Sequence, residues 1–371
     1  MDQIKTKVVK INEAYRRMRE EERSFSLEDR NRPETLTDED RKVLEEAAAV
    51  IKNGGLAAFP TETVYGLGAN ALDEKAAKKI YEAKGRPSDN PLIAHIADLD
   101  GLKPLVSEIP EAGRKLAEAF WPGPLTMVLR RKRVVPDVVT AGLDTVGMRC
   151  PAHPVCRAIL AAADVPVAAP SGNTSGRPSP TNMADMLEDM DGKIDGIVDG
   201  GPCAVGVEST IVDLTVMPPR LLRPGGVTLE QLRDALGEVA VDPAVTRLMG
   251  AGEQPRAPGM KYRHYAPKAP VTVVQGAPAA AARYIQAHMA PGDGVICFDE
   301  YAGLFAGHPL EQLGPSTDVP EQARRVFEAL RWFDGTGVSR IWAQCPAAAG
   351  IGLAVANRLN KAAGFHIVRA E

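Results

Sequence analysis

Hydrophobic and polar positions follow two kinds of spacing along the chain, and together they predict a mixed α/β protein. Leu44, Ala48 and Ile51 recur at helical spacing after Thr37, a residue type that caps helices, and Gly54-Gly55 would end that helix. Short apolar runs bounded by polar or glycine-rich segments predict buried strands. The expected strands are 56–59, 91–96, 125–129, 145–149, 167–169 and 209–214, and the expected helices are 73–84, 110–120, 153–163 and 228–236.

Beyond residue 270 the chain follows a regular strand–helix order, which predicts a small parallel sheet with helices on its faces. Prolines and glycines accumulate just before this part, as is typical of a long connecting segment. The second set of strands is expected at 271–274, 294–298, 340–343 and 366–368, with helices at 279–289, 321–333 and 350–363. The chain is expected to divide into four parts. Residues 1–36 hold a strand at 7–11 and a charged insert, 37–241 form a catalytic domain, 242–270 form a linker, and 271–371 form a second domain.

The composition and charge of the chain exclude several classes of protein. The 371 residues include 44 Lys and Arg against 48 Asp and Glu, a formal charge of −4, with 44% hydrophobic and 25% charged residues. These values exclude wholesale disorder, a fibrous chain and a membrane bundle. A protein that binds nucleic acid through a broad surface usually carries a basic excess, so no stable nucleic-acid binding is expected.

The five cysteines contain no C-x-x-C pair, which argues against both a disulfide framework and a thiolate zinc site. No apolar run is long enough to span a membrane, and the first residues lack the apolar core of a secretory signal. The sequence therefore predicts a cytoplasmic protein without a membrane association.

Three polar segments at strand or helix ends are candidates for chemistry. Residues 59–68 place hydroxyls and a carboxylate between a buried strand and a glycine-rich turn, where ligands gather in open α/β sheets. Residues 84–91 place Lys84 and Arg86 on a loop that suits a polyphosphate. Residues 168–179 supply glycines, hydroxyls and an amide that suit phosphate or sugar oxygens.

Each segment also has a purely structural interpretation: an ordinary strand exit, a helix end whose cations favour its dipole, and a flexible surface loop. His95, alone in a strand, is more often a hydrogen-bonded core residue than a ligand contact. The basic run Arg130–Arg133 could touch RNA, although a solvated strand end is the commoner explanation. No Walker A motif is present, and Gly350-Ile351-Gly352 is read as a helix start rather than a dinucleotide fingerprint.

Taken together, these segments resemble the YrdC-like family, in the long two-domain form of the Sua-type threonylcarbamoyl-AMP synthases. The resemblance runs in order over about residues 38–371, and the charged insert at 12–36 departs from it. The motifs that carry it are Pro60-Thr61-Glu62-Thr63-Val64-Tyr65-Gly66-Leu67, Lys84-Gly85-Arg86-Pro87, Pro91-Leu92 with His95, Trp121-Pro122-Gly123-Pro124-Leu125-Thr126, Ser171-Gly172-Asn173, Glu208-Ser209-Thr210, Arg223-Pro224-Gly225 and the linker 258–267.

The resemblance implies a twisted mixed α/β sheet with an open cavity, followed by a linker and a Rossmann-like parallel α/β domain. It implies a nucleotidyltransferase that converts L-threonine, bicarbonate and ATP to threonylcarbamoyl-AMP and pyrophosphate. Mg²⁺ would arrive with ATP, and neither an organic cofactor nor a metal held by protein residues is expected. The product would pass to a separate complex that forms threonylcarbamoyladenosine on tRNA.

The resemblance also assigns residues, position by position. Lys84, Arg86, Ser171 and Asn173 match the catalytic signature, and L-threonine would be held by Thr63, His95, Arg149, Ala169 and Ser209. ATP would be held by Arg86, Asn90, Thr145, Ser171, Ser179 and Arg223, with a linker contact from Tyr262 or its neighbours His264 and Tyr265.

The chemistry of these residue types agrees with the assignment. An arginine such as Arg149 can hold a carboxylate with two parallel hydrogen bonds, and Lys84 and Arg86 can stabilise charge that develops during nucleotidyl transfer. The proline-rich linker is expected to close over the cavity as a lid. The rival interpretation is a module that binds double-stranded RNA or tRNA on the concave face, which would show binding that weakens steeply with salt.

Overall fold

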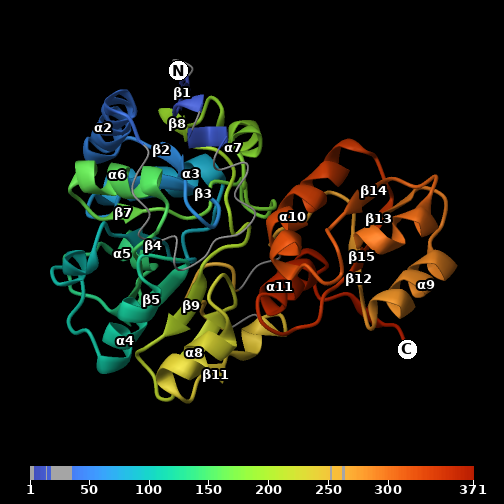
Figure 1. Ribbon diagram of the computed structural model, residues 1–371. Coiled ribbons are helices and arrows are strands. Elements are labelled where there is room, and N and C mark those ends of the chain that lie inside the picture. The colour runs from blue at the N-terminus through green and yellow to red at the C-terminus, as the bar shows by residue number, and fades with distance from the viewer. Residues whose placement is uncertain (1–3, 14, 18–35, 251–252, 261–263) are drawn as a thin grey trace.

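The computed structural model describes residues 4–13, 15–17, 36–250, 253–260 and 264–371, and it contains two separate sheets (Figure 1). Strands from residues 7–241 form one large twisted sheet of mixed direction, and strands from 271–369 form a smaller parallel sheet. No helix in these ranges is long and apolar enough to cross a membrane.

The order of the large sheet interleaves strands that are far apart in sequence. The sheet contains both antiparallel and parallel pairs, so neither a simple meander nor a simple parallel fold describes it. In spatial order the strands are β1 (Lys7–Lys10), β8 (Gly196–Asp199), β2 (Ala57–Pro60), β3 (Tyr65–Asn70), β7 (Val167–Ala168), β4 (Ile93–His95), β6 (Thr145–Arg149), β5 (Leu125–Arg130), β9 (Thr210–Asp213), β10 (Arg220–Arg223) and β11 (Ala240–Val241).

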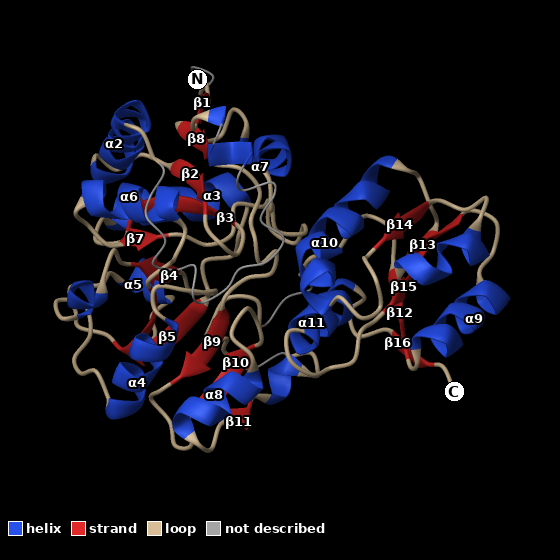
Figure 2. Cartoon of the chain, in the orientation of Figure 1, coloured by secondary structure: helices blue, strands red, loops and turns tan. Residues whose placement is uncertain are grey.

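Helices cover both faces of this sheet (Figure 2). Side chains alternate along a strand, so Phe59 of β2 packs in the cluster under α2 and α6, while its neighbour Ala58 faces the larger cluster on the other side. Thr37 caps α2 through a capping box with Asp40, as the sequence predicts. The helices are α2 (Asp38–Lys52), α3 (Glu74–Lys84), α4 (Glu111–Phe120), α5 (Asp137–Thr140), α6 (Pro154–Ala163), α7 (Met183–Met190) and α8 (Leu229–Leu236).

The second sheet is parallel throughout and carries helices on its faces, which confirms the prediction of a Rossmann-like fold for this part. The short strand β14 was not predicted. Its strands, in spatial order, are β14 (Leu310–Gln312), β13 (Asp293–Cys297), β15 (Arg340–Gln344), β12 (Val271–Gln275) and β16 (Ile367–Arg369), and its helices are α9 (Pro278–His288), α10 (Val319–Trp332) and α11 (Gly352–Ala362).

The secondary structure predicted from the sequence was wrong at residues 65–70. The glycines of Tyr65–Asn70 predict a turn, yet this segment forms β3 and pairs with β2 on one side and β7 on the other. A side chain at Gly68 would overlap the Phe59 ring, so glycine here allows close packing within the sheet. Most of the charged insert at 12–36 lies outside the described residues.

Helices α10 and α11 lie between their own sheet and the first domain (Figure 1). One apolar cluster crosses this boundary, because Val64 and Val205 of the first domain join Phe327 of α10 in it. The approach is closest at Gly206, where a Cβ atom would overlap the backbone of Arg324. The two domains are therefore packed against each other and share part of a core.

We expect Gly206→Ala to destabilise the protein more than Gly237→Ala. Both glycines have positive φ, +78° and +84°, so each alanine incurs about 1–3 kcal/mol of backbone strain. Only at Gly206 does the added methyl group meet another element, which adds about 1–3 kcal/mol for overpacking. Urea unfolding measures both losses, and equal losses in the two variants would contradict the close packing of α10 on residues 203–207.

Candidate functional site

Two of the predicted polar loops meet through a buried lysine. Lys84, the last residue of α3, is 2% exposed, and its ammonium donates to the carbonyls of Ser171, at 2.5 Å, and Asn173. Gly85 has a left-handed backbone conformation that ends α3 and lets the chain turn toward Arg86. Burial and the nearby Arg86 cation lower the pKa of Lys84 well below its usual range.

The side chains of this junction hold one another in place. The Ser171 hydroxyl donates to Asn173 Oδ1 at 2.6 Å, while Asn173 Nδ2 donates to the carbonyls of Thr174 and Arg177, both at 2.9 Å. Arg86 donates to the Pro91 carbonyl at 2.8 Å. The four signature residues therefore lie in one neighbourhood, bound mainly to backbone oxygens, and the cations keep capacity for an anionic ligand.

A second group forms at the end of β6. Arg149 is 4% exposed; its guanidinium donates to Thr63 Oγ1 at 2.9 Å and lies 2.6 Å from Glu62 Oε1. Thr63 Oγ1 is also 2.8 Å from the Thr61 hydroxyl. The strand exit after Pro60 thus supplies a buried carboxylate and hydroxyls to a buried arginine, which orients the guanidinium fork.

A third group lies between β9 and β10. Arg223 donates to the backbone oxygen of Ser209 at 3.0 Å and to its hydroxyl at 3.1 Å. Glu208 accepts from Ser179 at 2.6 Å and from Arg358 of α11 at 2.7 Å. Burial would raise the pKa of Glu208, but Arg358 and Arg223 lower it to about 2, so the side chain is a carboxylate at neutral pH.

The remaining predicted residues differ in their placement. His95 is buried at the end of β4, where burial and the Arg149 cation lower its pKa to about 3. Asn90 is buried with its side-chain oxygen unbonded, and the Ala169 amide donates to the Ile93 carbonyl at 3.0 Å. Thr145 begins β6, about 13 Å along the strand from Arg149, so the structure does not bring it into the three groups.

The described part of the linker lies against these groups. Pro258, Gly259, His264 and Tyr265 line a narrow cavity of about 30 Å³. Tyr262 lies outside the described residues. The rest of the cavity wall is formed by Lys84, Arg86, Ser171, Asn173, Ser175, Gly176, Glu208 and Arg223.

Sequence reasoning missed Arg358, which supplies a charge to this site from the second domain. The signal was present, because Arg358 lies on the same helical stripe as the buried Val355 and Ala362. The basic run Arg130–Arg133, by contrast, is engaged elsewhere: Arg130 pairs with Asp144 at 2.8 Å and Arg131 pairs with Asp137.

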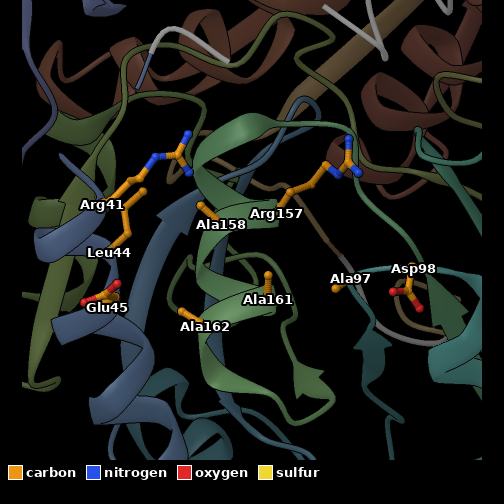
Figure 3. A pocket seen from close by; sticks show the side chains of 9 residues that line it. All are labelled: Arg41, Leu44, Glu45, Ala97, Asp98, Arg157, Ala158, Ala161 and Ala162. Atoms are coloured by element: carbon orange, nitrogen blue, oxygen red, sulfur yellow. The ribbon is translucent and has the colours of Figure 1, made fainter. Parts of the chain in front are cut away.

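A larger cavity opens elsewhere on the first domain, between α2 and α6, but no predicted site residue lines it (Figure 3). Its wall combines small alanines with a few charged side chains. The lining residues are Arg41, Leu44, Glu45, Ala97, Asp98, Arg157, Ala158, Ala161 and Ala162.

Comparison with known proteins identifies the family. Residues 49–225 match the family model described as "Telomere recombination" (Sua5_yciO_yrdC), and residues 227–364 match that of the threonylcarbamoyl-AMP synthase C-terminal domain. The threonylcarbamoyl-AMP synthase of Pyrococcus abyssi is 50% identical over 329 residues, which cover 87% of this chain and 94% of that protein. This chain belongs to the threonylcarbamoyl-AMP synthase family.

Other members of the threonylcarbamoyl-AMP synthase family agree with this assignment. The Bacillus subtilis protein of that name is 46% identical over 87% of this chain and 94% of its own length. Sua5 from Pyrococcus abyssi, complexed with L-threonine, superposes with a TM-score of 0.85 at 48% identity, covering 91% of this chain and 98% of that one. The predicted fold and the predicted threonylcarbamoyl-AMP synthase function are confirmed by these relatives.

We expect His95→Gln to make folding less sensitive to acid. The unfolded state binds a proton at His95 near pH 6.5, whereas the folded state does so only near pH 3, so stability falls as the pH drops below 6.5. This group alone removes about 2 kcal/mol of unfolding free energy between pH 7 and pH 5. Urea unfolding at both values should show that the variant loses about 2 kcal/mol less than the wild type; parallel losses would contradict a buried, neutral His95.

Proposed function

We propose that this chain joins L-threonine, bicarbonate and ATP into threonylcarbamoyl-AMP and releases pyrophosphate. The observation that carries the proposal is the division of the site into a buried arginine group around Arg149 and a cation-rich group around Lys84, Arg86 and Arg223. The first group suits an amino-acid carboxylate and the second suits a polyphosphate.

L-Threonine is proposed to bind at the group around Arg149. Arg149 would hold the carboxylate with two donors, and Thr63 and Ser209 would offer hydroxyls to its polar groups. The neutral ring of His95 adds no positive charge there, which helps the substrate amine to stay uncharged. Ala169 would contact the substrate through its backbone and its small side chain.

ATP is proposed to bind at the cation-rich group around Lys84, Arg86 and Arg223. Lys84 and Arg86 would neutralise the phosphates, and Arg223 would approach them from β10. The proposed ATP contacts are Arg86, Asn90, Thr145, Ser171, Ser179, Arg223 and Tyr262, with Asn173 completing the signature. Thr145 lies at the other end of β6 from Arg149, outside the three groups, and would contact a part of ATP other than the phosphates.

The proposed reaction has two bond-forming steps. The uncharged threonine amine attacks the carbon of bicarbonate, and water leaves to give a carbamate. A carbamate oxygen then attacks the α-phosphorus of ATP, and the bond to pyrophosphate breaks. The residues act by holding the reactants in line and by stabilising charge on the leaving group, since the site offers fixed donors rather than an activated nucleophile.

Mg²⁺ is proposed to enter bound to the nucleotide. The described residues include no group of three or more His, Cys, Asp or Glu side chains able to hold a metal ion, and Glu208 is already bonded to Ser179 and Arg358. The triphosphate itself supplies the oxygen ligands that Mg²⁺ prefers, and the metal would neutralise phosphate charge there.

The wider setting is also a proposal. Residues 242–270 would connect the catalytic and second domains, and the cavity that they line together with Lys84 and Arg223 supports a role in covering the nucleotide. A cytoplasmic enzyme without an organic cofactor would pass its unstable acyl-adenylate to a separate complex that modifies tRNA.

Pyrophosphate release tests the proposal. With ATP, Mg²⁺, bicarbonate and each amino acid in turn, we expect release that requires both L-threonine and bicarbonate.

Lys84→Met should reduce the rate of pyrophosphate release about 10²–10³-fold, as for the loss of one charge-stabilising donor. Arg149→Lys should raise the KM for threonine about tenfold or more, with little change in the KM for ATP, because a point charge replaces the bidentate fork.

Two results would contradict the proposal. Release that does not depend on threonine would exclude this substrate, and tight, salt-sensitive tRNA binding without any release would favour the RNA-binding alternative.

A further inference from the structure

Helix α11 brings Arg358 into the site from the second domain. The side chain is fully buried, and Nε donates to Glu208 Oε2 at 2.7 Å. Nη1 donates to the carbonyl of Pro224 at 2.9 Å and to Asn357 Oδ1 at 3.0 Å. The guanidinium carbon lies 5.6 Å from the centre of the Tyr265 ring. These contacts join the two domains at the wall of the proposed nucleotide site.

Glu208 is a buried carboxylate that faces two arginines. Arg358 takes one of its oxygens and Ser179 the other, while Arg223 exerts an electrostatic attraction but directs its donors to Ser209. A buried carboxylate that loses its ion-pair partner is strongly unfavourable. Without Arg358, Glu208 would be neutralised by the remaining arginine, and Arg223 would turn away from Ser209.

The two members of the pair are not equivalent. Arg358 keeps two uncharged acceptors, the Pro224 carbonyl and Asn357, if Glu208 loses its charge. Glu208 keeps the hydroxyls of Ser179 and Tyr265, but the other cations that attract it, Arg223, Lys84 and Lys361, lie at or beside the proposed nucleotide site. Loss of the arginine therefore perturbs the nucleotide group more than loss of the carboxylate charge.

We propose that Arg358 is a positioning residue for ATP: by neutralising Glu208 it keeps Arg223 and Ser179 in the positions from which they would bind the nucleotide, which makes α11 a necessary part of the catalytic site. The inference rests on the proposed assignment of Ser179 and Arg223 to ATP. The same helix holds the linker, because Lys361 donates to the carbonyl of Gly259 in the wall of the 30 Å³ cavity. The second domain thus acts mainly on the nucleotide group, and it reaches the threonine group through Ser209, whose hydroxyl Arg223 also contacts.

Separate binding measurements on the full chain test this assignment. Calorimetric titrations with ATP and with L-threonine, together with the KM for ATP in the pyrophosphate assay, should be compared for the wild type, Arg358→Met, Glu208→Gln and the double variant. We expect Arg358→Met to weaken ATP binding at least tenfold and to weaken threonine binding much less, because Arg149 keeps its bonds to Thr63 and Glu62. Glu208→Gln should weaken ATP binding less, and the double variant should recover most of the affinity that Arg358→Met loses.

Glu328→Ala is the matched control, since Glu328 accepts from Asn182 across the same domain boundary and does not touch Glu208. It should change neither affinity more than twofold. The proposal is overturned if Arg358→Met binds ATP normally, if Glu328→Ala weakens ATP binding equally, or if the double variant is no better than Arg358→Met. If Arg358→Met fails to fold, the double variant decides, because it buries no unpaired carboxylate and should bind ATP nearly as Glu208→Gln does.

The outcomes also separate this inference from the proposed function. A wild-type protein that binds ATP but releases no pyrophosphate with threonine contradicts the reaction, and the ATP titrations still report on Arg358.

Discussion

Positive charge is buried beside the site in excess of negative charge, and the surrounding structure is arranged around that excess. Lys84, Arg149 and Arg223 are each less than a tenth exposed. Removing such cations from water is costly unless donors find acceptors. Glu62 partners Arg149 directly, but among the described residues Lys84 has only carbonyl oxygens within hydrogen-bond distance. A bound anionic substrate would place a full negative charge beside Lys84, whereas the carbonyl oxygens carry only a partial one.

This constraint explains why the loops and the second domain pack as they do. The carbonyls around Lys84 are held by the Ser171–Asn173 hydrogen bond, and the loop of Arg86 is held by its bond to Pro91. Arg358 adds a further buried cation and uses it to hold Glu208. Because the apolar cluster around Phe327 includes Val64 of the first domain, the helices that carry these contacts cannot shift without exposing part of a shared core.

The sequence predicted the parts of the site that depend on local signals. Lys84 and Arg86 flank a glycine that ends a helix, and Ser171 and Asn173 follow a buried strand, so their position at the ends of elements could be inferred from neighbouring residues. Most strands and helices were predicted to within a few residues for the same reason. The Tyr65–Asn70 strand was missed because its glycines serve packing against Phe59, which sequence spacing does not reveal.

The partnerships between distant residues could not be predicted. The Glu62–Arg149 and Glu208–Arg358 pairs join positions 87 and 150 residues apart, and only the sheet order and the docking of α11 bring them together. Arg358 was detectable as a charge on an apolar stripe, but the stripe does not say which carboxylate it meets. The position of a single charged residue was therefore predictable where it lies at the end of a helix or strand. The residue that neutralises its charge was not predictable, because it lies far away in the sequence.

Proton uptake during ATP binding tests most directly whether Lys84 is buried without a charged partner until the nucleotide arrives. Titrations of ATP into the protein over a series of neutral to alkaline pH values, in two buffers with different heats of ionisation, measure the protons taken up. Burial lowers the pKa of Lys84 in the free protein, and a bound polyphosphate would raise it, so we predict net uptake that is smaller in Lys84→Met. ATP binding without proton uptake, or uptake unchanged in Lys84→Met, would contradict this account of the site.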